Sequence, residues 1–136
     1  MTCFDFENLD VYQVSMSFVL LVNEFSKNFP RGTFNLSDQL DRASTSVLFN
    51  IAEGAGEFAE MEKIRFYRMA RRSATECAAI LQLANNLKLL DNNNYSIAKD
   101  LLIRIVSMLS KMTRKYNSAT YTKESQSTMR ESFESI

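Results

Sequence analysis

Apolar residues recur at steps of three and four along most of this chain, which is the spacing of one face of an α-helix. The repeat is interrupted at Pro30 and Gly32, at Gly54 and Gly56, and in the turn-forming run 91–94. The pattern therefore predicts four helices, over about residues 8–28, 37–56, 60–90 and 95–117.

Two of these segments differ from a simple amphipathic helix. Residues 8–28 have apolar side chains on two faces, which predicts burial beyond a two-layer contact. These faces are Val11, Val14, Phe18, Leu21 and Phe25, and Leu9, Tyr12, Met16 and Val19. Residues 60–90 hold an unbroken heptad-like seam that is mostly small in its middle, which favours close approach by a neighbouring helix. The seam is Phe66, Ala70, Ser73, Cys77, Ile80, Ala84 and Leu87.

Short connections make successive helices antiparallel, so the predicted fold is all-α: an up-down-up-down four-helix bundle over residues 1–117. Residues 118–136 are rich in Ser, Thr and Glu, which is typical of a disordered tail. Within this tail, Met129, Phe133 and Ile136 are four and three residues apart. A second interpretation is therefore a short helix that docks on its own bundle or on a neighbouring copy.

Composition supports a single helical domain and narrows its chemistry. The 136 residues are 46% hydrophobic and include only three glycines and one proline, which favours long helices. Histidine is absent, which removes the commonest general base and metal ligand. Cys3 and Cys77 lack metal-ligand spacing, and no phosphate loop or activated nucleophile is present. We expect no enzyme activity, cofactor, metal or small-molecule substrate.

The chain carries no recognisable targeting or membrane segment. Its N-terminus lacks the basic region of a signal peptide, and its longest apolar run, 18–22, is far too short to cross a bilayer. These features predict a cytoplasmic protein without membrane contact.

Asn50 falls on the inward-facing stripe of residues 37–56, one turn before Gly54. A buried amide without partners costs about 1–3 kcal/mol, so we expect Asn50 to bond to Ser73 or Glu76 of the next helix. Gly54 leaves room for a close approach. The full predicted polar set is Gln39, Arg42, Ser46, Asn50, Glu53, Ser73 and Glu76. This set is either a polar site between helices or a hydrogen-bond network that fixes their register.

Basic residues are concentrated in residues 60–90, although the chain as a whole is neutral, with 16 basic and 16 acidic residues. Arg65, Arg68 and Arg72 share one helical face. The candidate phosphate contacts are Lys63, Arg65, Arg68, Arg71, Arg72, Arg104, Lys111, Arg114 and Lys115. The alternative is a solvated face balanced by Glu62 and Glu76. In a ring of copies, these residues would form a continuous basic surface.

Several runs in the first three predicted helices resemble a known family. They are Phe29-Pro30, Leu36-Ser37-Asp38-Gln39-Leu40, Asn50-Ile51-Ala52-Glu53-Gly54 and Ala70-Arg71-Arg72-Ser73. Over about residues 4–109, the chain resembles the four-helix bundle proteins named for reading frames in intervening sequences of bacterial 23S rRNA. The Asn-Ile-Ala-Glu-Gly run is the most specific part of this resemblance.

The resemblance implies an antiparallel bundle that assembles as a homopentameric ring. It also implies similarity to the accessory variability determinant of diversity-generating retroelements, a basic pentamer that binds nucleic acid and a reverse transcriptase. This chain departs from those proteins in having zero formal net charge. We expect a non-enzymatic oligomeric scaffold that binds RNA or a ribonucleoprotein. The alternative is a protein-binding adaptor, for example an accessory partner of a reverse transcriptase, without direct nucleic-acid contact.

Overall fold

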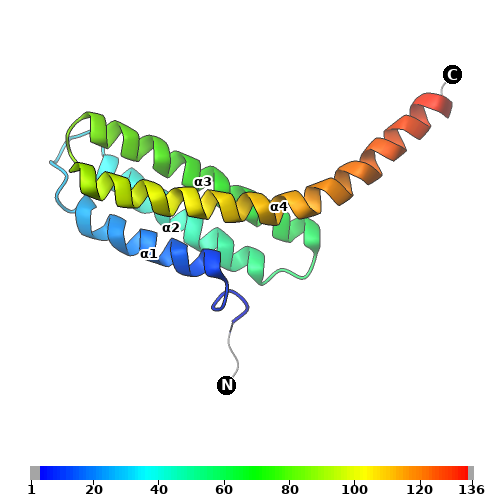
Figure 1. Ribbon diagram of the computed structural model, residues 1–136, viewed down its shortest axis with the longest axis horizontal. Helices are drawn as coiled ribbons and strands as arrows, with labels where there is room; N and C mark the ends of the chain where they lie inside the picture. Colours follow the sequence, from blue (N-terminus) through cyan, green and yellow to red (C-terminus); the bar gives the residue numbers. More distant parts are fainter. Residues whose placement is uncertain (1–3, 135–136) are drawn as a thin grey trace.

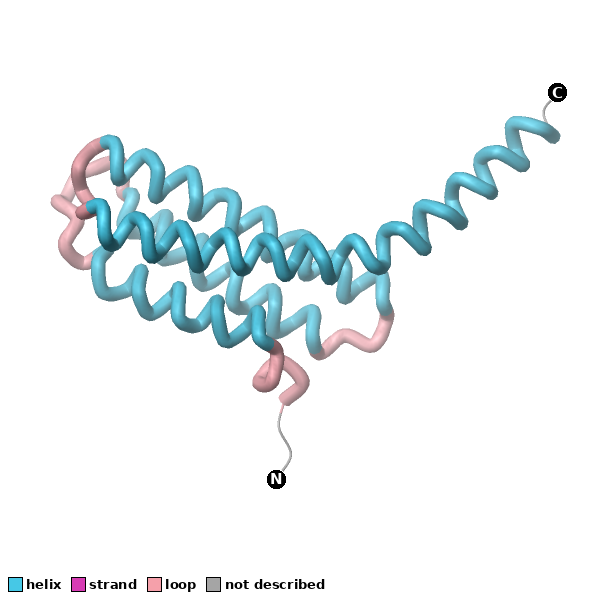
Figure 2. The backbone as a smooth tube through the Cα atoms, viewed as in Figure 1, coloured by secondary structure: helices cyan, strands magenta, loops and turns pink. Residues whose placement is uncertain are grey.

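The computed structural model describes the backbone of residues 4–134 and the side chains of residues 4–114. Regular structure in this range consists of α1 (Asp10–Ser26), α2 (Leu36–Ala55), α3 (Glu60–Asn86) and α4 (Asn92–Glu134), as Figure 1 shows. Figure 2 shows short loops between successive helices. The predicted all-α class and four-helix order are confirmed.

Each helix packs against two others. α1 packs on α2 and α4, and α3 packs on α2 and α4, whereas the diagonal pairs do not approach each other within the described residues. Successive helices run in opposite directions (Figure 1). The result is an antiparallel four-helix bundle around one core.

The core is built from the inward stripes of all four helices. Phe18, Leu40, Cys77 and Ile105 are among its fully buried side chains. On α1 the first predicted stripe is buried except for Leu21, which is half-buried. The second stripe, Leu9, Tyr12, Met16 and Val19, is half-buried throughout. The two predicted faces of α1 therefore have different environments in the isolated chain.

The turns depend on local backbone geometry. Gly32 has φ +83°, a left-handed conformation that suits glycine. Phe34 and Asn35 also have positive φ, at 56° and 54°. The side-chain amide of Gln39 donates to the Phe34 carbonyl at 2.8 Å and supports this turn. At the start of α4, the Asn94 backbone N–H donates to the Asp91 carboxylate at 2.6 Å.

The predicted end of the fourth helix near residue 117 is wrong, because α4 continues to Glu134. Figure 1 shows its last part leaving the bundle. No glycine or proline follows Gly56, so the sequence contains no strong helix breaker in this region. The side chains of Met129, Phe133 and Ile136 lie outside the described residues, so their docking stays a prediction.

Candidate functional site

Asn50 is half-buried and bonds within its own helix. Its side-chain amide donates to the Ser46 carbonyl at 2.8 Å and to the Ser46 hydroxyl at 3.1 Å. Ser46 in turn shares a 2.9 Å hydrogen bond with the hydroxyl of Ser73 on α3. The predicted direct bond from Asn50 to Ser73 or Glu76 is therefore wrong. An amide four residues after Ser46 reaches a carbonyl of its own helix first, and Ser46 provides the link across the helices.

Much of the predicted polar set gathers at one groove between α2 and α3. The groove has a volume of about 440 Å³ and is lined by Asn35, Gln39, Arg42, Ala43, Ser46, Ser73 and Glu76. Arg42 and Glu76 are exposed there, and neither forms an ion pair within the described side chains. Asn50 does not line the groove but donates a hydrogen bond to the Ser46 hydroxyl, which does. Glu53 is exposed and does not line the groove.

Gly54 lies where α3 packs closely against α2. A Cβ at this position would stand 2.8 Å from Tyr67 Cε1 and 3.1 Å from Phe66 Cβ. The predicted need for a close approach is confirmed, and the approaching group is the Tyr67 ring. The Asn50–Gly54 run therefore shapes the joint between the two helices.

Lys63 stabilises the same joint. Its ammonium group donates to the carbonyls of Gly54 and Ala55, at 3.1 Å each. These carbonyls lie at the end of α2, where the Glu57 backbone N–H also donates to the Gly54 carbonyl at 3.2 Å, and a cation at this position complements the helix dipole. Lys63 was predicted as a phosphate contact, but the structure gives it a structural role that the sequence pattern did not reveal. The available signal was its position shortly after the end of α2.

The arginines of α3 differ in their surroundings. Arg65 forms an ion pair with Glu62, with 2.8 Å between Nη2 and Oε2, and its guanidinium lies 5.0 Å from the centre of the Phe66 ring. Arg68 and Arg72 are exposed, and Arg71 is half-buried. Because 65, 68 and 72 are three and four apart, the exposed arginines form one outward face, which we call the α3 arginine face.

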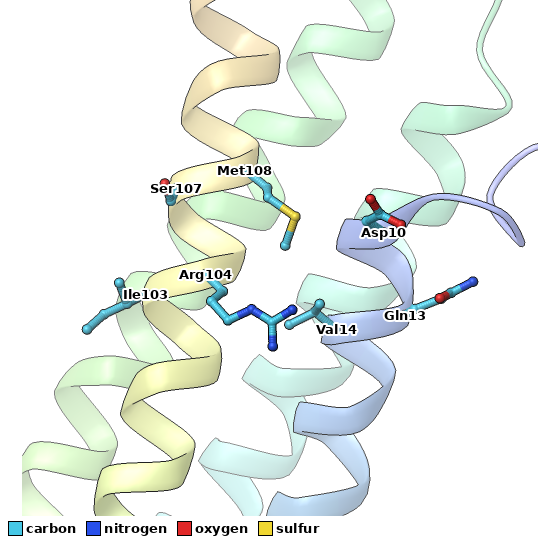
Figure 3. Close-up of a pocket in the computed structure, with 7 residues that line it drawn as sticks. All are labelled: Asp10, Gln13, Val14, Ile103, Arg104, Ser107 and Met108. Atoms are coloured by element: carbon cyan, nitrogen blue, oxygen red, sulfur yellow. The ribbon is translucent and has the colours of Figure 1, made fainter.

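The basic residues of α4 belong in part to another surface. Arg104 lines a groove of about 410 Å³ between α1 and α4, and Figure 3 shows its guanidinium reaching toward Val14. Lys111 and Arg114 are exposed, and the side chain of Lys115 lies outside the described residues. Since α3 and α1 do not approach each other, the Arg104 groove is separate from the α3 arginine face.

The Cys77 thiol is fully buried on α3. Burial raises the pKa of the Cys77 thiol to about 12, and the nearby negative charge of Glu76 adds to the shift. Among the described residues, no three His, Cys, Asp or Glu side chains are grouped to hold a metal ion. Their helices also include none that is long and apolar enough to span a membrane.

A family model of the 23S rRNA-intervening sequence protein matches residues 7–111. The chain belongs to this family. The crystal structure of a protein of unknown function from the S23 ribosomal protein family of Bacteroides thetaiotaomicron has the same fold, with a TM-score of 0.71. The two share 21% sequence identity, over 76% of this chain and 97% of that one. No curated protein matches the chain.

One feature of this intervening sequence protein was missed by sequence reasoning. Large apolar side chains stand exposed on α2 and α3 and in the turn before α2: Phe34 is 68% exposed, Phe49 59%, Leu83 43% and Met69 40%. The signal was present at Phe49, because this aromatic residue falls on the outward side of α2, away from the buried positions 47 and 51. Phe49 lies outside the buried stripe, so core periodicity does not single it out.

Proposed function

We propose that this 23S rRNA-intervening sequence protein is a non-enzymatic oligomeric scaffold that binds RNA or a ribonucleoprotein through the α3 arginine face. The observation that carries the proposal is the exposure of Arg68 and Arg72 beside Arg65 on one side of a rigid helix. Guanidinium groups bind phosphate oxygens in a bidentate manner, and a helix presents them at fixed spacing. Since the chain is neutral overall, binding depends on this local cluster.

Assembly into the homopentameric ring implied by the family resemblance is part of the proposal. The half-buried second stripe of α1 supports it, because an oligomer can cover apolar surface that a single chain leaves partly exposed. A ring also repeats the arginine face around its circumference, so that one RNA meets several weak contacts at once.

The test is RNA binding by the full chain and a variant. We expect fluorescence anisotropy with a labelled RNA to show binding at low salt, weakened at least about tenfold by Arg68→Ala with Arg72→Ala. The matched control is Lys27→Ala with Arg31→Ala, which removes the same charge from exposed positions around the end of α1. An absence of binding at low salt, or equal losses in both variants, contradicts the proposal.

A protein-binding adaptor is the second candidate function. Its specific support is the set of exposed apolar side chains on α2, on α3 and in the turn before α2, together with zero net charge. Co-purification from the native host separates the two functions. A partner, such as a reverse transcriptase, that stays bound after nuclease treatment and with the Arg68→Ala, Arg72→Ala variant favours the adaptor.

A further inference from the structure

We propose that this protein binds unpaired RNA by stacking a nucleobase on the exposed ring of Phe49, beside the α3 arginine face. The inference rests on the proposed RNA binding and narrows its ligand to single-stranded RNA. Phe49 on α2 is 59% exposed, and Met69 on α3 is 40% exposed. Neither side chain belongs to the buried core or to the candidate phosphate contacts.

The first step is the level of Phe49 along α3, which two contacts fix. The hydroxyls of Ser46 and Ser73 share a hydrogen bond, and a Cβ added at Gly54 would lie 3.1 Å from Phe66 Cβ. The two helices run in opposite directions (Figure 1). Counting residues from the first contact places Phe49 level with position 70 of α3, and counting from the second places it level with position 71.

The second step is the position of the arginines around this level. Arg68 and Arg72 lie on either side of it, each within about three residue rises, ~4.5 Å, along the bundle. Met69 and Arg72 are three residues apart and share one face of α3. Phe49, Arg68 and Arg72 are all exposed, and packed helices lie about 8–10 Å apart between axes. The Phe49 ring therefore has guanidinium groups beside it on the same surface.

The third step is the chemistry of the occupant. An aromatic ring beside guanidinium groups suits a single-stranded nucleotide chain, because the ring stacks a base and the arginines bind the adjoining phosphates. In a duplex the bases are paired and stacked on each other, so Phe49 has no base face to contact and only the arginines contribute. Since every base has a flat face, the stacking itself gives little sequence preference.

The acidic residues of this surface limit the length of the site. By the same register, Glu53 of α2 and Glu76 of α3 lie beyond the two ends of the stretch from Arg68 to Arg72. Both are exposed, and their charges repel phosphate. Each chain therefore holds a short stretch of RNA around one stacked base, and a longer RNA gains affinity by contacting several copies.

Truncation of the ring tests the stacked base. We expect Phe49→Ala to weaken binding of a labelled oligouridylate by about 5- to 150-fold in fluorescence anisotropy, because one stacked base is lost. The salt dependence should keep its slope, since no phosphate contact is removed. Binding of an RNA duplex of the same length should stay unchanged within about twofold. Circular dichroism checks the fold of the variant.

The matched control is Phe34→Ala, which removes a ring that is 68% exposed in the turn before α2, away from the arginines. It should bind oligouridylate as the native protein does. Native-like binding by Phe49→Ala, with the Arg68→Ala, Arg72→Ala variant still weakened, overturns the stacked base and leaves the proposed function standing. Equal losses in the two phenylalanine variants, or equal losses for single strand and duplex, also overturn it. No RNA binding by the native protein overturns both proposals.

A fluorescent reporter provides a second test. The chain contains no tryptophan, so Phe49→Trp places a single indole at the site. Oligouridylate should quench its emission by stacking on it, whereas the duplex should not, and Phe34→Trp should respond to neither. Unchanged emission of Phe49→Trp on binding overturns the proposal. Emission that is already blue-shifted before RNA is added would show that a protein surface covers the ring, and would overturn it as well.

Discussion

The hydroxyl groups of Ser46 and Ser73 share a 2.9 Å hydrogen bond that joins α2 to α3. The side-chain amide of Asn50 donates to both the hydroxyl and the carbonyl of Ser46 and so restrains the Ser46 hydroxyl. This bond sets the register on which the α2–α3 groove and the positions of Arg42 and Glu76 depend. The hydrogen bonds among Asn50, Ser46 and Ser73 therefore fix how α2 lies against α3, and with it the shape of the α2–α3 groove.

Replacing Ser46 and Ser73 by alanine measures the strength of this link. Each single substitution should lower the free energy of unfolding by about 0.5–1.5 kcal/mol, because it removes one partly exposed hydrogen bond. The double variant should cost less than the sum of the two, since both substitutions remove the same bond. Urea unfolding measures all four proteins. Strictly additive losses would show that the two hydroxyls are not coupled.

Gly54→Ala should destabilise the bundle by about 1–3 kcal/mol, because the new methyl group would press against the Tyr67 ring. The direction is informative, since alanine in place of glycine normally favours a helix by up to ~1 kcal/mol. Gly56→Ala is the control. A Cβ added at Gly56 would lie 3.7 Å from the Glu53 carbonyl oxygen, which is an ordinary contact, and we expect little change. A stabilised Gly54→Ala protein would contradict the close approach.

Lys63→Met separates a structural role from phosphate binding. The substitution keeps a long apolar side chain but removes the cation from the carbonyls of Gly54 and Ala55, so we expect a loss of about 1 kcal/mol of unfolding free energy. RNA affinity measured on the folded variant should stay unchanged within about twofold. A large fall in RNA affinity without a fall in unfolding free energy would indicate that Lys63 contacts phosphate.

The buried thiol of Cys77 gives a pH dependence with a definite sign. Its pKa rises from 9.0 to about 12 on folding, so the folded state retains the proton more tightly than the unfolded state. The stability associated with this group is complete below about pH 9 and is lost as the pH rises toward 12. Urea unfolding across this range should therefore show a steeper decline for the native protein than for Cys77→Ala. Parallel declines would refute the shift.

The sequence predicted the bundle well because helical periodicity reports burial directly. The core residues Phe18, Cys77 and Ile80 all fall on the predicted stripes. The end of α4 was missed because composition indicated a tail, whereas only glycine or proline strongly stops a helix. The partner of Asn50 was missed because spacing shows which face a side chain is on, but not whether a nearer carbonyl of its own helix will accept the bond.

The same limit applies to the candidate surface. Spacing correctly placed Arg65, Arg68 and Arg72 on one exposed face. The alternative that Glu62 balances this face holds for Arg65, which forms an ion pair with it. Spacing did not reveal that Lys63 turns back to the end of α2, since this depends on side-chain geometry. Exposed apolar residues such as Phe49 fall outside the core stripe, so a search for core periodicity does not single them out, although their outward position can be read from the helical spacing.

The salt dependence of RNA binding tests the central claim most directly. The logarithm of the association constant for a single-stranded RNA should fall linearly with the logarithm of the salt concentration, because phosphates that contact the protein release their counterions. Removing Arg68 and Arg72 should reduce the slope by about 1.4, or about 0.7 for each lost phosphate contact, while Lys27→Ala with Arg31→Ala should leave it unchanged. An unaltered slope in the Arg68→Ala, Arg72→Ala protein, or no binding by the native protein at low salt, would contradict the proposed function.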